Sequence, residues 1–138
     1  MKRIIAIDYG DARTGVAVSD LTDTLAGEAL TIQEWNAEKL AQRLAFFARE
    51  RDAEKFVLGL PKNMDGTEGP RAEKARQFKA LLEEASGLPV ILWDERRSTI
   101  EAHAILHAAG KKEKKHRANV DAVAATLLLE GYLASPNR

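Results

Sequence analysis

The chain has 138 residues with 21 basic and 21 acidic side chains, so we expect one compact domain over 1–138 without a global positive charge to attract a polyanion. The absence of cysteine excludes disulfides, thiolate metal sites and thiol catalysis. No apolar run approaches the roughly 20 residues that cross a bilayer, and the segment before the first predicted strand is too short for a signal sequence, so we expect a cytoplasmic protein without membrane contact.

Three strands are predicted in the first quarter of the chain. Residues 3–8 form a nearly continuous apolar run that ends in Asp8, just before a glycine turn, as is typical of a buried strand leaving the core. The segment 14–19 resumes this composition after a short link that suits a hairpin, and 25–32 supplies a third strand. The sheet is therefore expected to have an antiparallel start.

Helices and strands alternate in the rest of the chain. Apolar spacing and turn residues predict a helix over 36–50 with Asn36 as N-cap, a strand over 56–60, a helix over 70–85 ended by Gly87, a strand over 90–93, a helix over 100–109 capped by Ser98, and a helix from 120 to about 133 capped by Asn119. Strands that alternate with helices pair in parallel, so the sequence predicts an α/β fold.

Carboxylates occur at three places where such a fold binds ligands. Asp8 ends one buried strand, and Asp94 and Glu95 end or follow another, so they lie where open α/β sheets hold ligands. Asp121 shares a helix face with apolar positions, where an unpaired carboxylate is costly. Taken singly, each acid has a structural explanation. Asp8 can be a turn residue, Asp94 or Glu95 a surface charge, and Asp121 a carboxylate favoured by the helix dipole. Together they would repel one another without a hard cation, which predicts a Mg²⁺ or Mn²⁺ centre suited to phosphodiester hydrolysis.

Basic residues cluster beside these acids. Arg96 and Arg97 follow the acidic pair, and a basic run leads into the last helix; the run contains Lys111, Lys112, Lys114, Lys115 and Arg117. Such charge neutralises a nucleic acid backbone, although a solvated charged surface is the alternative explanation. Lys62 and Asn63 lie in the glycine-rich segment 59–69, which either receives a phosphate group or is a plain strand-to-helix loop.

Four motifs occur in order, over 8–17, 59–69, 94–99 and 121–125. Together they resemble the YqgF/RuvX family of ribonuclease H-like nucleases, which is similar in fold to the RuvC junction resolvases. The resemblance covers nearly the whole chain and implies a mixed five-stranded sheet, with its first three strands antiparallel, flanked by helices.

The resemblance also implies roles for particular residues. It implies Asp8, Glu95 and Asp121 as catalytic, metal-binding acids, with Asp94 as a further candidate ligand. The first motif contains Arg13, which we add to the candidate nucleic-acid contacts. RuvC-type centres use four acids, whereas Ala124 stands three residues after Asp121, so the number of metal ions, one or two, stays open.

Several functions are compatible with these features. The resemblance implies either a nuclease that processes the 5′ end of precursor 16S ribosomal RNA in ribosome biogenesis, or a Holliday junction resolvase that cuts four-way DNA junctions in recombination and repair. The expected partner is thus structured RNA or branched DNA, and the junction reaction would need a homodimer with two active sites. A non-catalytic nucleic-acid-binding module is a third alternative.

An enzyme of another class shares part of this pattern. The segments 8–10 and 14–17 also resemble the first phosphate loop of actin-like ATPases and sugar kinases. Those enzymes close two domains around a nucleotide, and 138 residues leave no room for the second domain. The nuclease is therefore the favoured hypothesis.

Overall fold

The computed structural model describes residues 3–20, 26–63, 65–94 and 120–135. Its elements are strands β1 (Arg3–Asp8), β2 (Arg13–Ser19) and β3 (Ala26–Gln33), helix α1 (Ala37–Glu50), strand β4 (Ala53–Leu60), helix α2 (Pro70–Ser86), strand β5 (Val90–Asp94) and helix α5 (Val120–Ala134). The order is the one expected from the sequence. The helix predicted over 100–109, its cap Ser98 and the cap Asn119 lie outside the described residues.

The five strands form one mixed sheet in the order β3-β2-β1-β4-β5. β2 is antiparallel to both β1 and β3, whereas β4 is parallel to both β1 and β5. The predicted antiparallel start and later parallel pairing are thus confirmed. β4 begins earlier than its apolar run predicted because Ala53 pairs with Arg3 at the start of β1. The parallel strands β1, β4 and β5 all end at the same edge, which we call the carboxyl edge.

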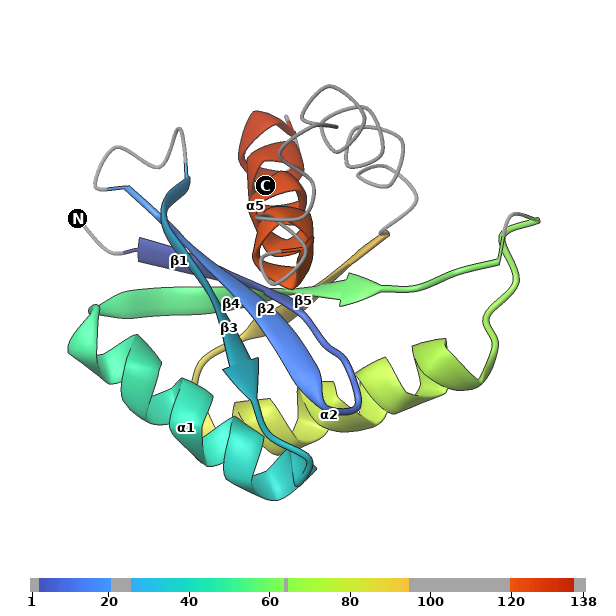
Figure 1. Ribbon diagram of the computed structural model, residues 1–138, viewed down its shortest axis with the longest axis horizontal. Helices are drawn as coiled ribbons and strands as arrows, with labels where there is room; N and C mark the ends of the chain where they lie inside the picture. The colour runs from blue at the N-terminus through green and yellow to red at the C-terminus, as the bar shows by residue number, and fades with distance from the viewer. Residues whose placement is uncertain (1–2, 21–25, 64, 95–119, 136–138) are drawn as a thin grey trace.

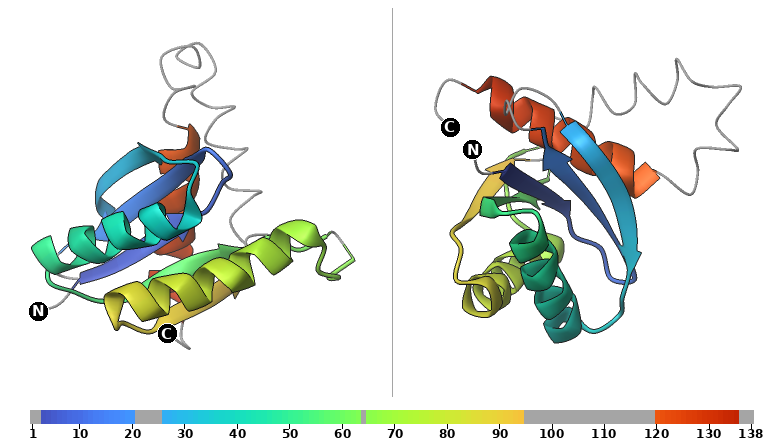
Figure 2. Two further views of the ribbon diagram at one scale, coloured as in Figure 1. Left: turned by 90° about the horizontal axis from the view of Figure 1, so that it is seen from below. Right: turned by 90° about the vertical axis from the view of Figure 1, so that its left-hand side faces the viewer.

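Helices cover both faces of the sheet. α1 and α2 pack against one face, and α5 lies across the other (Figures 1 and 2). Strand side chains alternate between the two layers, since Ile5 and Ile7 pack in the core beneath α1 and α2, while Ile4 and Ala6 pack against α5. We call these the α2 face and the α5 face. None of the described helices is long and apolar enough to cross a membrane.

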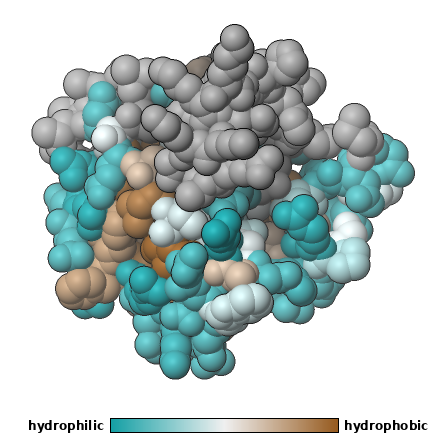
Figure 3. Space-filling view, viewed as in Figure 1, coloured by the Kyte–Doolittle hydropathy of each residue, from teal (hydrophilic) through white to brown (hydrophobic). Residues whose placement is uncertain are grey.

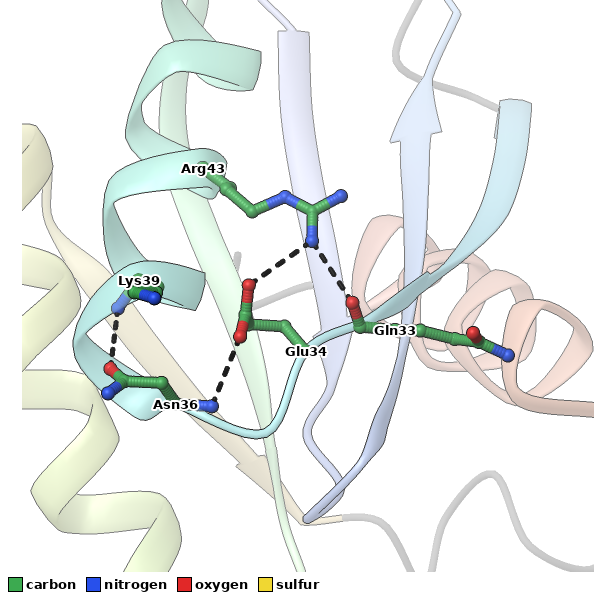
Figure 4. Close-up of polar contacts among 5 residues, drawn as sticks. All are labelled: Gln33, Glu34, Asn36, Lys39 and Arg43. Carbon is green, nitrogen blue, oxygen red and sulfur yellow. Dashed lines mark hydrogen bonds and ion pairs between the residues drawn. The ribbon is translucent and has the colours of Figure 1, made fainter.

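Helix α1 begins where the sequence predicts. The Asn36 side chain accepts a hydrogen bond from the Lys39 amide at 3.0 Å, which satisfies a donor in the first turn (Figure 4). The Arg43 guanidinium donates to the Gln33 carbonyl at 3.0 Å and lies 3.5 Å from the Glu34 carboxylate. These bonds hold the link between β3 and α1 and so orient the helix beneath the sheet.

Helix α2 also has the ends that the sequence predicts. Pro70 occupies the beginning of the helix, where its missing N–H costs nothing. Gly87 follows the last turn at a φ of 71°, a left-handed conformation that favours glycine, and its amide donates to the Glu83 carbonyl. The helix therefore runs from the carboxyl edge to the opposite edge before β5 starts.

The first turn of α5 lies directly against β2 at Gly15. A Cβ atom at this position would overlap the backbone carbonyl of Asp121. Small, fully buried side chains continue the contact, with Ala17 on β2 and Ala125 on α5 in the same core cluster. The absence of a side chain at residue 15 thus lets the helix approach the sheet closely.

We predict that Gly15→Ala lowers the free energy of unfolding by about 1–3 kcal/mol, because the α5 backbone must move to accept a methyl group. Gly27→Ala is the matched control, since a Cβ atom there meets Asp20 at an ordinary 3.4 Å. Urea denaturation of the two variants measures the difference. Equal stabilities would contradict the close approach of α5 to β2.

Candidate active site

Asp8 is the last residue of β1 and lies half-buried at the carboxyl edge. Its partner across the antiparallel ladder is Gly15. Residues opposite each other in such a pair point to the same face, with Cβ atoms about 4.5–5.5 Å apart. Because Gly15 faces the first turn of α5, the Asp8 side chain emerges on the α5 face beside that turn.

Asp121 lies half-buried in the first turn of α5, and its backbone touches Gly15. Asp8 and Asp121 therefore approach the same point of the sheet from different elements, although they are far apart in sequence. The N-terminal end of a helix favours a carboxylate through the helix dipole, so this position suits Asp121. Two of the three predicted sources of acid are thus brought together.

Asp94 ends β5 at the same edge but on the other face. It pairs with Leu60 of β4, which packs in the core beneath α1 and α2. The preceding residue, Trp93, packs in the cluster against α5. Alternation along the strand therefore directs Asp94 to the α2 face, away from the side that Asp8 occupies.

Glu95, the remaining predicted acid, lies outside the described residues. Within the part of the chain that the structure describes, no three carboxylate or imidazole side chains are grouped closely enough to hold a metal ion. The acids that converge, Asp8 and Asp121, offer only hard oxygen donors, which are the ligands that Mg²⁺ and Mn²⁺ prefer. Their chemistry therefore fits the predicted type of ion.

Arg13 lies at the carboxyl edge near these acids. It is the exposed first residue of β2 and stands two positions before Gly15, so it shares the α5 face. Other predicted nucleic-acid contacts, Arg96, Arg97, Lys111, Lys112, Lys114, Lys115 and Arg117, lie outside the described residues. Arg13 thus supplies positive charge on the same face as Asp8.

Lys62 and Asn63 belong to an ordered loop between β4 and α2. The Asn63 side chain donates to the Thr67 hydroxyl at 2.9 Å, and its backbone amide donates to the Thr67 carbonyl at 2.8 Å. Lys62 and Glu68 form an isolated antiparallel bridge. The Glu68 carboxylate accepts two hydrogen bonds of 2.7 Å from the Arg76 guanidinium, which hold the pKa of Glu68 below its ordinary value. This ion pair fastens the loop to α2.

A cavity of about 240 Å³ opens at the carboxyl edge beside the start of α2. Its lining residues are Tyr9, Gly10, Asp11, Gly59, Pro61, Arg71, Lys74 and Ala75. The sequence patterns did not single out Arg71 and Lys74, although their spacing of three places them on one side of a helix that follows a glycine-rich loop. The end of the molecule formed by this loop and the start of α2 is mostly hydrophilic (Figure 3).

The chain is similar to known proteins over nearly its whole length. The family model RuvX, described as Holliday junction resolvase, matches residues 2–135. A Halothermothrix orenii protein, provisionally named pre-16S rRNA nuclease, is 42% identical over 137 residues, which cover 99% of this chain and 97% of the relative.

Solved structures show the same fold at low sequence identity. T. thermophilus RuvC, in complex with a Holliday junction substrate, has a TM-score of 0.59 at 14% identity, covering 97% of each chain. A ROK family protein from Streptococcus pneumoniae, in complex with sucrose, has a TM-score of 0.52 at 18% identity and covers 77% of this chain but only 39% of its own. The chain therefore matches T. thermophilus RuvC, which has the ribonuclease H-like nuclease fold, over nearly the full length of both proteins.

We predict that Arg76→Gln loosens the loop over 61–69, because it removes both bonds to Glu68. Amide hydrogen-exchange protection of Asn63 and Gly66 should fall, whereas Lys79→Gln on the same helix, whose contact with Glu83 is 3.9 Å, should leave it unchanged. Equal protection in both variants would contradict the fastening role.

The same ion pair predicts a dependence on pH. Because the folded-state pKa of Glu68 is lowered, its stabilising effect is complete above the ordinary value of 4.5 and is lost as pH falls through the lowered pKa. Protection factors of the loop should therefore decline on acidification in the wild type but not in Arg76→Gln.

Proposed function

This chain belongs to the RuvX family, and on that premise we propose that it is a divalent-metal-dependent nuclease that trims the 5′ end of precursor 16S ribosomal RNA. The observation that carries the proposal is the convergence of Asp8 and Asp121 on one point of the carboxyl edge. The name of the Halothermothrix orenii relative supports RNA as the substrate, and processing of ribosomal RNA in turn implies a cytoplasmic location.

We assign the metal ligands to Asp8, Glu95 and Asp121. Asp94 is a less suitable ligand because strand alternation directs it to the opposite face from Asp8. A bound Mg²⁺ or Mn²⁺ would activate water and neutralise charge on the scissile phosphate. The contribution of the protein is rigidity, since Asp8 is held by the β1–β2 ladder and Asp121 by the packing of α5 on that ladder.

Positive charge on the same side supports nucleic-acid binding. Arg13 is exposed on the α5 face, and we assign Arg96, Arg97 and the basic run over 111–117 to contacts with the phosphate backbone. Lys62 has the same role at the loop between β4 and α2. Asn63 is a weaker candidate because its side chain is engaged with Thr67.

Resolution of four-way DNA junctions is the second candidate function. The description of the RuvX family and the fold shared with T. thermophilus RuvC favour it. Symmetric cleavage of a junction requires two active sites, so this function also implies a homodimer. The substrate and the oligomeric state are therefore tested together.

We predict that Asp8→Asn lowers the cleavage rate at least about a hundredfold while sparing substrate binding, because it removes a ligand of the catalytic ion. The assay compares a labelled precursor 16S ribosomal RNA fragment with a labelled four-way DNA junction, in magnesium, manganese or chelator. Asp52→Asn is the matched control, since Asp52 lies beyond α1 at the other edge and has a φ of 53°, which asparagine tolerates.

Each result of this assay has a distinct meaning. Metal-dependent trimming of the RNA alone supports the processing nuclease, and paired symmetric nicks in the junction support the resolvase. Cleavage by Asp8→Asn at the wild-type rate would show that the proposed centre is wrong. Binding of both substrates without cleavage by the wild type would favour the non-catalytic module.

A second prediction separates the neighbouring acids at the end of β5. Glu95→Gln should lower kcat as strongly as Asp8→Asn, whereas Asp94→Asn should retain kcat within about tenfold of the wild type, because Asp94 lies on the other face. Circular dichroism checks that both variants fold. If Asp94→Asn lowered kcat more than Glu95→Gln did, Asp94 and not Glu95 would be the metal ligand.

A further inference from the structure

We propose that the cavity between the carboxyl edge and the start of α2 holds a backbone phosphate of the substrate, with Arg71 and Lys74 as its positioning residues. This inference rests on the proposed nuclease function and adds a further place at which the substrate strand is held. The family motifs found in the sequence contain neither residue.

The cavity lies next to Asp8 at the carboxyl edge. Its wall begins with Tyr9 and Gly10, which directly follow Asp8, and continues to Gly59 and Pro61 at the end of β4. Asp8 emerges on the α5 face, whereas α2 closes the cavity from the other face. A strand with one phosphate at Asp8 that crosses the carboxyl edge therefore reaches the cavity with a neighbouring phosphate.

Two positively charged side chains line the cavity. Arg71 and Lys74 lie in the first two turns of α2, three residues apart, so they stand on the same side of the helix. The helix dipole adds to their attraction for an anion. Within the described residues, Arg71 takes part in no ion pair, so its planar guanidinium is available for two hydrogen bonds to a phosphate.

Lys74 is held in a pair that a phosphate can replace. Its Nζ atom lies 3.2 Å from the Asp11 carboxylate, and the two side chains are 58% and 74% exposed. Exposed pairs of this kind contribute little to stability. Asp11 therefore keeps Lys74 pointed at the cavity before substrate binds, and it competes weakly with the incoming phosphate.

Tyr9 gives the cavity a rigid, uncharged wall. Its ring stacks on Phe78 with centroids 4.3 Å apart and planes 5° from parallel. A volume of about 240 Å³ is several times that of a water molecule and admits a phosphodiester group.

A structural explanation of the same residues predicts different behaviour. On that explanation the pair of Lys74 and Asp11 merely ties the link between β1 and β2 to α2, and substitution of Asp11 would reduce stability without affecting binding. On our proposal, Asp11→Asn removes a competing negative charge, so it should tighten nucleic-acid binding. The two explanations therefore differ in whether Asp11→Asn tightens nucleic-acid binding.

The experiment measures binding of a fluorescein-labelled precursor 16S ribosomal RNA fragment over a series of salt concentrations, in the Asp8→Asn background to prevent cleavage. Combined Arg71→Gln and Lys74→Gln should raise Kd about tenfold and make the plot of log K against log salt less steep by about 0.7, the value for one neutralised phosphate of single-stranded RNA. Arg49→Gln, at the far end of α1, is the control for loss of a positive charge away from the cavity and should change neither quantity.

Kinetics and stability complete the test in the otherwise wild-type enzyme. The double variant should raise KM by the same factor and keep kcat within about twofold, as expected for residues that hold substrate equally in the ground and transition states. Thermal unfolding confirms that the exposed substitutions leave the fold intact.

The possible failures point to different conclusions. If the double variant and Arg49→Gln have equal Kd and equal salt slope, while Asp8→Asn still abolishes cleavage, the cavity is no phosphate site and the proposed function stands. If Asp11→Asn lowers the melting temperature without tightening binding, the structural explanation replaces ours. If Asp8→Asn cleaves normally, the proposed function itself fails.

Discussion

The contact between the first turn of α5 and Gly15 of β2 decides the geometry of the active edge. The backbone of Asp121 rests where a side chain at residue 15 would stand, and Asp8 is the partner of Gly15 across the ladder. Any larger residue would push α5 outward and move Asp121 away from Asp8. Packing of small side chains such as Ala17 and Ala125 maintains the same close approach further along the helix.

The carboxyl edge presents two chemically different sides. On the α5 face, carboxylates converge and Arg13 is exposed, which suits a metal ion and the phosphate it acts on. On the α2 face, Arg71 and Lys74 line a cavity. Because strand side chains alternate, residues that are neighbours in sequence serve opposite sides of one edge. A substrate strand that crosses the edge would therefore be held on both sides of the reacting bond.

The sheet of this protein also occurs in longer chains. The ROK family protein shares the sheet, but this chain covers only 39% of its length, whereas the match with T. thermophilus RuvC is complete to 97% in both directions. Function in this fold depends on which side chains occupy the carboxyl edge. Here two acids, Asp8 and Asp121, converge on the α5 face of this edge.

The sequence by itself determined the described elements and their order, because apolar periodicity, helix caps such as Asn36 and glycine stops such as Gly87 are local signals. It ranked Glu95 above Asp94 only through the family resemblance, since the face that Asp94 occupies depends on strand register, which only pairing with β4 decides. The close approach at Gly15 and the cavity beside Arg71 likewise arise from contacts between distant segments. Local patterns carry no information about such contacts, so only the tertiary structure decided them.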